Sequence, residues 1–155
     1  MGKTYCFILD SDQKIIVCAF TISNDSIKTT HLPNNRKKCV NKTIPEQKRM
    51  RSYPAVLIGR LGVNKNFRTI IGEEERIGTQ LMNFIKSWFI DSKNKTGCRF
   101  IVVDSYNERI PLKYYKNNGF IPLFSTEKQE KEYTGLPPDH TLKTRFLYFD
   151  LIVLK

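Results

Sequence analysis

A strand-like segment joined to an amphipathic helix through a short glycine-containing turn is the feature that most constrains how this chain can fold. Residues 54–63 form a nearly unbroken apolar run that is too short to cross a membrane as a helix. Between residues 76 and 90, apolar residues recur at helical spacing, at Ile77, Leu81, Phe84, Ile85 and Trp88. The sequence therefore predicts a strand over 54–63 followed by a helix over 76–90.

The turn at the start of that helix is a candidate anion site. Its sequence is Arg76-Ile77-Gly78-Thr79-Gln80-Leu81. Where a strand leads into a helix in this way, backbone N–H groups without partners and the helix dipole point at the same place, and both favour an anion such as a phosphate. A small glycine turn is equally common in an ordinary strand–helix connection. The turn alone leaves both interpretations open.

A second strand–helix unit follows in the chain. Residues 99–104 have the composition of a buried strand, and residues 110–118 are predicted as a short helix. Pro111 suits the first turn of this helix, and Asn118-Gly119 suits its C-terminus, where a left-handed residue is needed. A short strand is expected over residues 120–124.

The N-terminal third begins with a predicted hairpin. Residues 4–9 and 15–22 are strand-like, and residues 10–14 between them suit a turn. Residues 23–53 are polar, basic and rich in asparagine. A connection of that length is usually functional or mobile, or it contains a short helix.

The C-terminal part completes the expected fold class. Thr126-Glu-Lys-Gln129 resembles a capping box for a short helix that ends by Gly135, and residues 144–154 are predicted as a terminal strand. With 155 residues the chain is expected to form one domain over its whole length. The order of elements predicts an α/β (α+β) protein with a mixed central sheet flanked by helices.

Two segments resemble the GNAT superfamily of acetyl-CoA-dependent N-acetyltransferases. Leu112-Lys-Tyr-Tyr-Lys-Asn-Asn-Gly-Phe120 is similar to the helix that reads A-x-x-F-Y-x-x-x-G-F in that superfamily. Pro54 to Val63 resembles the strand before its pyrophosphate loop, and is most similar to the toxin-type branch that acetylates aminoacyl-tRNA. The resemblance covers about residues 4 to 124 and the last strand. It implies acetyl-CoA as cosubstrate, an amine as acceptor and a GNAT-like sheet.

The pyrophosphate loop departs from the pattern of that superfamily, which usually reads Q/R-x-x-G-x-G/A. Phe67-Arg68 looks like its usual start, residues 69–75 look like an insertion, Arg76 replaces the first glycine and Gly78 keeps the last. A side chain at position 76 narrows the space for a phosphate, but its guanidinium can pair with the phosphate directly. The cofactor contacts implied here are Arg68, Arg76, Ile77, Gly78, Thr79 and Gln80.

Three carboxylates in the apparent insertion allow two interpretations. Glu73-Glu74-Glu75 would repel a phosphate if they faced it. We favour the alternative, in which they face solvent at the start of the helix and interact favourably with its dipole.

The resemblance also implies how the acetyl group is handled. A strand bulge at Leu61, Gly62 and Val63 is expected to free the Val63 N–H for the thioester carbonyl oxygen. A lone strand glycine such as Gly62 is also compatible with simple close packing. Tyr115 takes the role of the acid towards the leaving thiolate, whereas Tyr114 aligns with a buried phenylalanine.

Two further points concern the acceptor side. Asn107 looks like the side-chain contact to the pantetheine arm, although it could simply flank the helix. Asp104 and Glu108 lie nearby in the sequence, but neither is assigned as a general base. The strand and helices that usually precede the hairpin are apparently absent, which would expose a sheet face or edge that a second copy or an antitoxin-like protein could cover.

The formal net charge of +11 suggests a polyanionic partner. Basic residues gather in Arg36-Lys37-Lys38, Lys42 and Lys48-Arg49-Met50-Arg51, so tRNA is a candidate acceptor through residues 36–51. A solvated basic face is the alternative, and no aromatic platform for stacking bases is visible there. A non-catalytic GNAT-fold module that binds nucleic acid or a protein partner is the competing function.

The remaining composition argues against several other classes. Cys6, Cys18, Cys39 and Cys98 show no C-x-x-C spacing, and the two histidines have no metal-ligand spacing, so no metal is expected. Cys6, Cys18 and Cys98 lie in or beside apolar strands and are expected to be small buried residues in a reducing compartment. No signal peptide or long apolar run is visible, so we expect a cytoplasmic protein that does not bind membranes.

Overall fold

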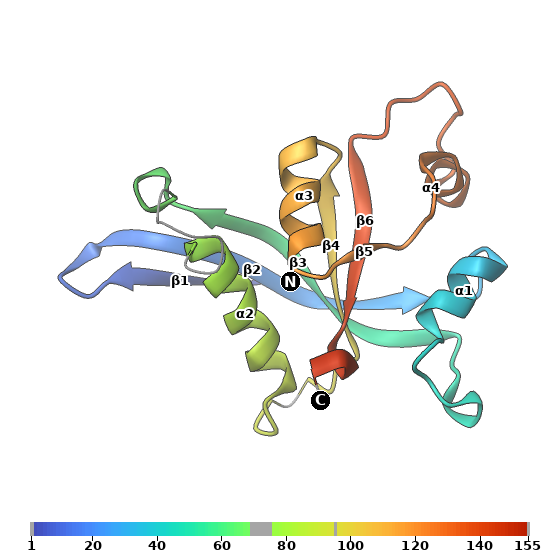
Figure 1. Cartoon of the computed structure of the whole chain (residues 1–155), viewed down its shortest axis with the longest axis horizontal. Coiled ribbons are helices and arrows are strands. Elements are labelled where there is room, and N and C mark those ends of the chain that lie inside the picture. The colour runs from blue at the N-terminus through green and yellow to red at the C-terminus, as the bar shows by residue number, and fades with distance from the viewer. Residues whose placement is uncertain (1, 69–75, 95, 155) are drawn as a thin grey trace.

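The computed structural model describes residues 2–68, 76–94 and 96–154, and is built around a six-stranded sheet (Figure 1). The strand order is β1-β2-β3-β4-β6-β5. Among the strands that the structure describes, only the pair β3–β4 is parallel, so the predicted mixed sheet is confirmed. The strands are β1 (Lys3–Leu9), β2 (Asp12–Lys28), β3 (Ser52–Val63), β4 (Phe100–Tyr106), β5 (Ile121–Pro122) and β6 (Thr144–Asp150).

Helices lie on both faces of the sheet (Figure 1). A cluster of buried residues packs on each face. The helices are α1 (Asn34–Val40), α2 (Ile77–Ile90), α3 (Arg109–Asn117) and α4 (Glu127–Thr134). The first core cluster packs α2 and α3 against β2, β3 and β4. The second cluster, on the other face, joins α1 and the segment before α4 to β3, β4 and β6. The amphipathic pattern over 76–90 is therefore a core-facing pattern, with Leu81, Met82 and Ile85 buried.

The hairpin that opens the sheet is longer than the sequence predicted. The second strand runs from Asp12 to Lys28 rather than over 15–22, because its polar second half pairs with the first half of β3. Only Ile27 in that half is a buried hydrophobic residue, so the sequence there carries no apolar pattern. The rest of the predicted connection contains α1, which confirms the alternative of a hidden short helix.

The strands expected at the C-terminus are shorter than predicted. The strand expected over 120–124 is only Ile121–Pro122, and the strand expected over 144–154 ends at Asp150. Beyond it, Leu151–Leu154 form a 3-10 turn in which Leu151 is buried and its N–H bonds to the carbonyl of Arg99. The apolar run continues there because the turn packs on the first core cluster, not because the strand continues.

A β-bulge in β3 lies at Gly59, and the bulge predicted at residues 61–63 is wrong. Thr21 pairs with Arg60 and Ile22 pairs with Ile58, which leaves Gly59 as the extra residue. The burial pattern requires it: Val56 and Ile58 face the first core cluster before the bulge, and Leu61 and Val63 face it afterwards. Since strand side chains alternate between faces, one extra residue is needed to change from even to odd positions.

Candidate active site

The sheet forks where β3 and β4 separate. Their parallel ladder runs from Ala55↔Phe100 to Ile58↔Val103 and then stops. Beyond that point, among the described residues, β3 continues to Val63 paired with β2 alone, and β4 continues to Tyr106 paired with β6 alone. Within the described residues, one edge of residues 59–63 therefore carries backbone groups with no ladder partner. An extended ligand can pair with such an edge.

The start of α2 lies beside this fork and offers free amides. Arg76 is the N-cap and its side chain makes no capping hydrogen bond. In the part of the chain that the structure describes, the N–H groups of Ile77 and Gly78 have no acceptor. These are two of the four amides that any helix leaves without an internal partner. The turn thus has the backbone features of the anion-binding site that the sequence suggested.

The two arginines assigned to the loop differ in their freedom. Arg68 donates from Nε to the carbonyl of Val63 at 2.9 Å, so its side chain folds back over the end of β3. Arg76 is exposed. Residues 69–75, which include the apparent insertion and its three glutamates, lie outside the described residues.

Tyr115 lies on α3, on the same face of the sheet as α2. Its ring packs against Tyr114 and Phe120, with centroid separations of 5.1 and 5.4 Å. Burial raises the pKa of the Tyr115 phenol to about 12. Its hydroxyl makes no hydrogen bond with any described residue. The phenol is therefore protonated at neutral pH and free to donate a hydrogen bond.

Tyr114 reaches across to α2. Its hydroxyl donates a 2.7 Å hydrogen bond to the carbonyl oxygen of Gly78. A Cβ atom at Gly78 would lie 3.2 Å from the Tyr114 ring, so a larger residue would push that ring by a few tenths of an ångström, and glycine suits the close approach of the two helices. Leu61, Val63 and Ile77 pack on the same cluster as both tyrosines. The fold thus brings together the end of β3, the first turn of α2 and the two tyrosines of α3.

Asn107 is turned away from the first turn of α2. Its Nδ2 donates to the Glu127 carboxylate and to the carbonyl of Leu142, both at 2.9 Å. Both amide hydrogens therefore already bind the protein, where they fasten the start of α4. Any contact from Asn107 to a pantetheine arm would have to use its Oδ1 atom.

Asp104 is a site residue that the sequence left unassigned. It is the first residue of β4 after the last β3–β4 pair, so it lies at the fork. Phe100 and Val102 face the second core cluster, and strand alternation puts Asp104 on that same face, opposite Tyr115. The carboxylate is exposed and forms no hydrogen bond or ion pair within the described ranges. Strand alternation over residues 100–104 could have predicted which face of the sheet Asp104 lies on. The sequence could not show that the fork begins there, because that depends on where the β3–β4 ladder ends.

The basic segment 36–51 divides into structural and exposed residues. Arg36 donates to the backbone carbonyls of Pro122 and Leu123, so it fastens α1 to β5 and is not a free cation. Arg49 pairs with Glu46 at 3.2 Å. The residues of this segment that are exposed and have no such partner are Lys38, Lys42, Lys48 and Arg51.

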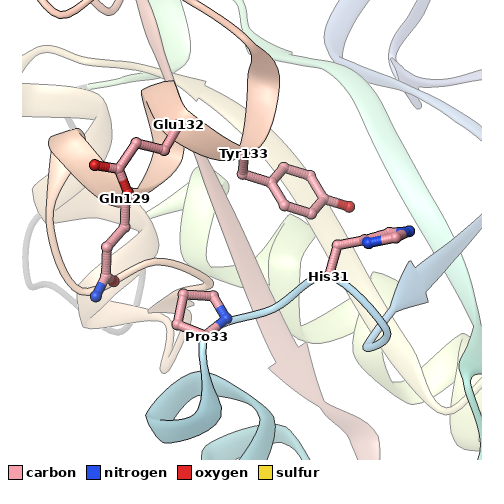
Figure 2. A pocket seen from close by; sticks show the side chains of 5 residues that line it. All are labelled: His31, Pro33, Gln129, Glu132 and Tyr133. Carbon is pink, nitrogen blue, oxygen red and sulfur yellow. The ribbon is translucent and has the colours of Figure 1, made fainter.

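A separate pocket of about 370 Å³ lies between α4 and the residues before α1 (Figure 2). Its walls come from His31, Pro33, Gln129, Glu132 and Tyr133. None of the residues that the resemblance assigns to the cofactor lines this pocket, and it adjoins the second core cluster instead. It is therefore distinct from the fork.

Neither a metal cluster nor a membrane helix is found in the described part of the chain. Over residues 2–68, 76–94 and 96–154, no group of three histidine, cysteine or acidic side chains is placed to hold a metal ion. In those same ranges, no helix has the length and apolar character needed to span a membrane.

Comparisons with known proteins identify the fold. No protein-family model matches the chain, and no curated protein matches it. Among solved structures, AtaT in complex with acetyl-methionyl-tRNAfMet is 18% identical over 99% of this chain and 73% of its own, with a TM-score of 0.59. A tyrosine-to-phenylalanine mutant of the AtaT toxin, bound to the C-terminus of the antitoxin AtaR and to acetyl-CoA, is 15% identical over 99% of this chain and 70% of its own, with a TM-score of 0.56. A similar mutant of KacT is 17% identical over 90% of this chain and 65% of its own, with a TM-score of 0.53. The chain thus has the GNAT-like fold of these proteins.

Proposed function

We propose that this chain is an acetyl-CoA-dependent N-acetyltransferase. The observation that carries the proposal is the fork, where the end of β3, the first turn of α2 with its Ile77 and Gly78 amides, and the Tyr115 side chain all lie against one core cluster. The shared fold supports it, because AtaT has been solved with acetyl-CoA and with acetyl-methionyl-tRNAfMet.

The cofactor is assigned to the α2 side of the fork. The amides of Ile77 and Gly78 receive the diphosphate, with Arg76 and Arg68 as neighbouring cations. Thr79 and Gln80 complete the first turn of α2. The amide-rich pantetheine arm runs along the free edge of β3 at Leu61, Gly62 and Val63, as an added strand would.

Acetyl-CoA supplies an activated thioester, and the chain needs to do three things. It polarises the carbonyl, for which the bulge at Gly59 is a better candidate than the predicted position at Val63, because the backbone departs from ladder geometry there. It stabilises the departing sulfur by a hydrogen bond from Tyr115. A phenol with a pKa of about 12 is a weaker acid than a thiol of about 8.5, so hydrogen bonding outweighs full proton transfer.

Asp104 provides the third function, on the acceptor side. From the opposite face of the fork, its carboxylate holds the attacking amine and accepts the proton that leaves as the new N–C bond forms and the C–S bond breaks. A group at this position can meet the acceptor without competing with α2 and α3 for the cofactor.

The acceptor class we favour is aminoacyl-tRNA. The exposed cations Lys38, Lys42, Lys48 and Arg51 belong to the segment just before β3. Ser52 and Gly59 are seven residues apart along that strand, or roughly 23 Å. An acceptor that touched both the fork and these cations would have to be long, which fits a nucleic acid and not a small amine.

The cellular setting follows from the same proposal. A cytoplasmic enzyme of this kind would meet charged tRNA directly, and a second copy or an antitoxin-like protein could cover its exposed edge strand β1. The KacTA–DNA complex, with 13% identity and a TM-score of 0.54, is a solved case of this fold in a larger assembly.

The test is a transfer assay with labelled acetyl-CoA against bulk charged tRNA and a panel of small amines. Transfer is expected with the parent protein, and Asp104→Asn is expected to lower kcat and to raise the KM for the acceptor, while leaving acetyl-CoA affinity unchanged. Acetyl-CoA binding measured by calorimetry distinguishes the acetyltransferase from the competing hypothesis of a non-catalytic module, which predicts no binding. Absence of both binding and transfer in the parent would overturn the proposal.

A further inference from the structure

Helices α2 and α3 are joined by a hydrogen bond at the start of α2. The Tyr114 hydroxyl donates to the carbonyl oxygen of Gly78 at 2.7 Å, and burial raises the pKa of this phenol, so it remains a donor at neutral pH. The helix that carries Tyr114 is thereby attached to the same turn whose amides face the fork. A phenylalanine at position 114 could pack there but could not make this bond.

A second hydrogen bond joins the same two helices further along. Lys86 on α2 is 8% exposed, and its Nζ donates to the backbone carbonyl of Asn118 at 2.6 Å. The Phe149 ring lies 4.2 Å from Nζ, and burial lowers the pKa of the ammonium. No carboxylate pairs with Lys86 in the described ranges. Burying a lysine without a carboxylate partner is costly, and the carbonyl of Asn118 at the C-terminus of α3 offsets part of that cost.

The two bonds fix α3 on α2 at two points. Gly78 and Lys86 are eight residues apart on α2, or roughly 12 Å, and Tyr114 and Asn118 are four residues apart, or roughly 6 Å. One attachment would allow α3 to pivot, whereas two attachments fix its rotation. The Asn118 N–H also donates to the carbonyls of Tyr114 and Tyr115. The attachment made by Lys86 is therefore linked directly to the turn of α3 that carries Tyr115.

We propose that Tyr114 and Lys86 are positioning residues that hold the Tyr115 hydroxyl in place relative to the first turn of α2. This inference rests on the proposed acetyltransferase function and on the role given to Tyr115 in it. Neither side chain needs to touch the substrate. Both act by fixing the position of the Tyr115 hydroxyl relative to the first turn of α2, where the cofactor is assigned. A displacement of about 1 Å at a reacting group can lower the rate by roughly 10²-fold.

The test is a set of double-mutant cycles. Tyr114→Phe and Lys86→Met are each made in the parent and in a Tyr115→Phe background, and kcat is measured at saturating acetyl-CoA and acceptor. In the parent, each change is expected to lower kcat by about 10- to 100-fold with little change in acetyl-CoA affinity. In the Tyr115→Phe background, each is expected to lower kcat less than about 2-fold, because residues that act as a unit are not additive.

Tyr133→Phe is the matched control, since Tyr133 is 40% exposed and its hydroxyl bonds to no described residue. It should leave kcat unchanged in both backgrounds. An equal loss of kcat in both backgrounds would mean that Tyr114 and Lys86 are merely structural, and would overturn the inference. Full activity of Tyr115→Phe would overturn it as well. A parent without any transfer activity would refute the proposed function itself, and this inference would fall with it.

Discussion

At the scale of single residues, Gly78 meets two requirements in one position. Its N–H has no acceptor among the described residues, and its α-carbon faces the ring of Tyr114 closely enough that a Cβ would lie 3.2 Å away. The sequence suggested only the first requirement. The second gives a packing reason for glycine at this position that holds whether or not a phosphate binds there.

Gly78→Glu is expected to abolish acetyl-CoA binding, with a loss of affinity of more than about 10²-fold. A carboxylate a few ångströms from the diphosphate costs several kcal/mol at an effective dielectric of about 20. Isothermal titration calorimetry measures the effect. Gly78→Gln is the matched control, because it adds the same bulk against Tyr114 without the charge and should bind more tightly than the glutamate variant. Parent-like affinity of Gly78→Glu would remove the diphosphate from this turn.

Tyr115 gives a prediction about pH. The protonated phenol is the active form, and burial moves its pKa upward to about 12, so its contribution should be retained to higher pH than for an ordinary tyrosine. The ratio of the parent rate to the Tyr115→Phe rate is expected to be about 10²–10⁴ and constant from pH 7 to 10, with acetyl-CoA affinity nearly unchanged. Transfer rates across that range measure it. A ratio that declines with a midpoint near pH 10 would contradict the buried, raised-pKa phenol.

At the scale of elements, α4 depends on one buried ion pair. Glu130 on α4 is 3% exposed, accepts from Arg145 Nε at 2.7 Å and accepts the Phe146 N–H. These contacts fasten α4 to β6 next to the two β6 residues that pair with β5. Burial raises the pKa of the Glu130 carboxyl, while the Arg145 and Phe146 donors oppose that shift.

Glu130→Ala is therefore expected to lower the free energy of unfolding by roughly 3–5 kcal/mol, because it leaves the Arg145 guanidinium buried without its partner. Urea unfolding followed by circular dichroism measures the change. Lys128→Ala is the control on the same helix, since its 4.0 Å pair with Glu132 is exposed and should contribute less than about 0.5 kcal/mol. Equal effects of the two substitutions would refute the importance of the buried pair.

At the scale of the whole molecule, the distribution of charge distinguishes a long acceptor from a small one. Replacing Lys38, Lys42, Lys48 and Arg51 with glutamine is expected to flatten the salt dependence of tRNA affinity. Each lost phosphate contact should reduce the slope by roughly 0.7–0.9 log units of affinity per log unit of salt. Acetyl-CoA affinity should not change, because these residues lie at the opposite end of β3 from the fork. Filter binding at several salt concentrations measures the slopes.

Arg36→Gln provides the contrast for that measurement. Its guanidinium holds the carbonyls at 122 and 123, so the substitution should lower stability and leave the salt slope unchanged. If tRNA does not bind near physiological salt, or if the parent and the glutamine variants show equal slopes, the basic segment is a solvated face. Transfer to small amines that ignores these substitutions would support the same conclusion.

Local signals in the sequence were enough to predict several of the elements. The apolar run over 54–63, the helical spacing over 76–90 and the Pro111 and Asn118-Gly119 boundaries all lie within one element, and the structure has β3, α2 and α3 at those places. The mixed sheet follows from their order along the chain. Periodicity and capping act over a few residues, so they can be read without knowing what packs against them.

Features that depend on a partner distant in sequence could not be predicted before the folded chain was known. The polar half of β2 is a strand because β3 lies beside it, and the bulge is at Gly59 because Leu61 and Val63 must reach the first core cluster. Asn107 bonds to α4 and its flanking segment, and Arg36 bonds to β5, although each carried a functional interpretation in the sequence. Asp104 acquires its place only where the β3–β4 ladder ends. Strand register and side-chain partners are set by long-range packing, which no local pattern encodes.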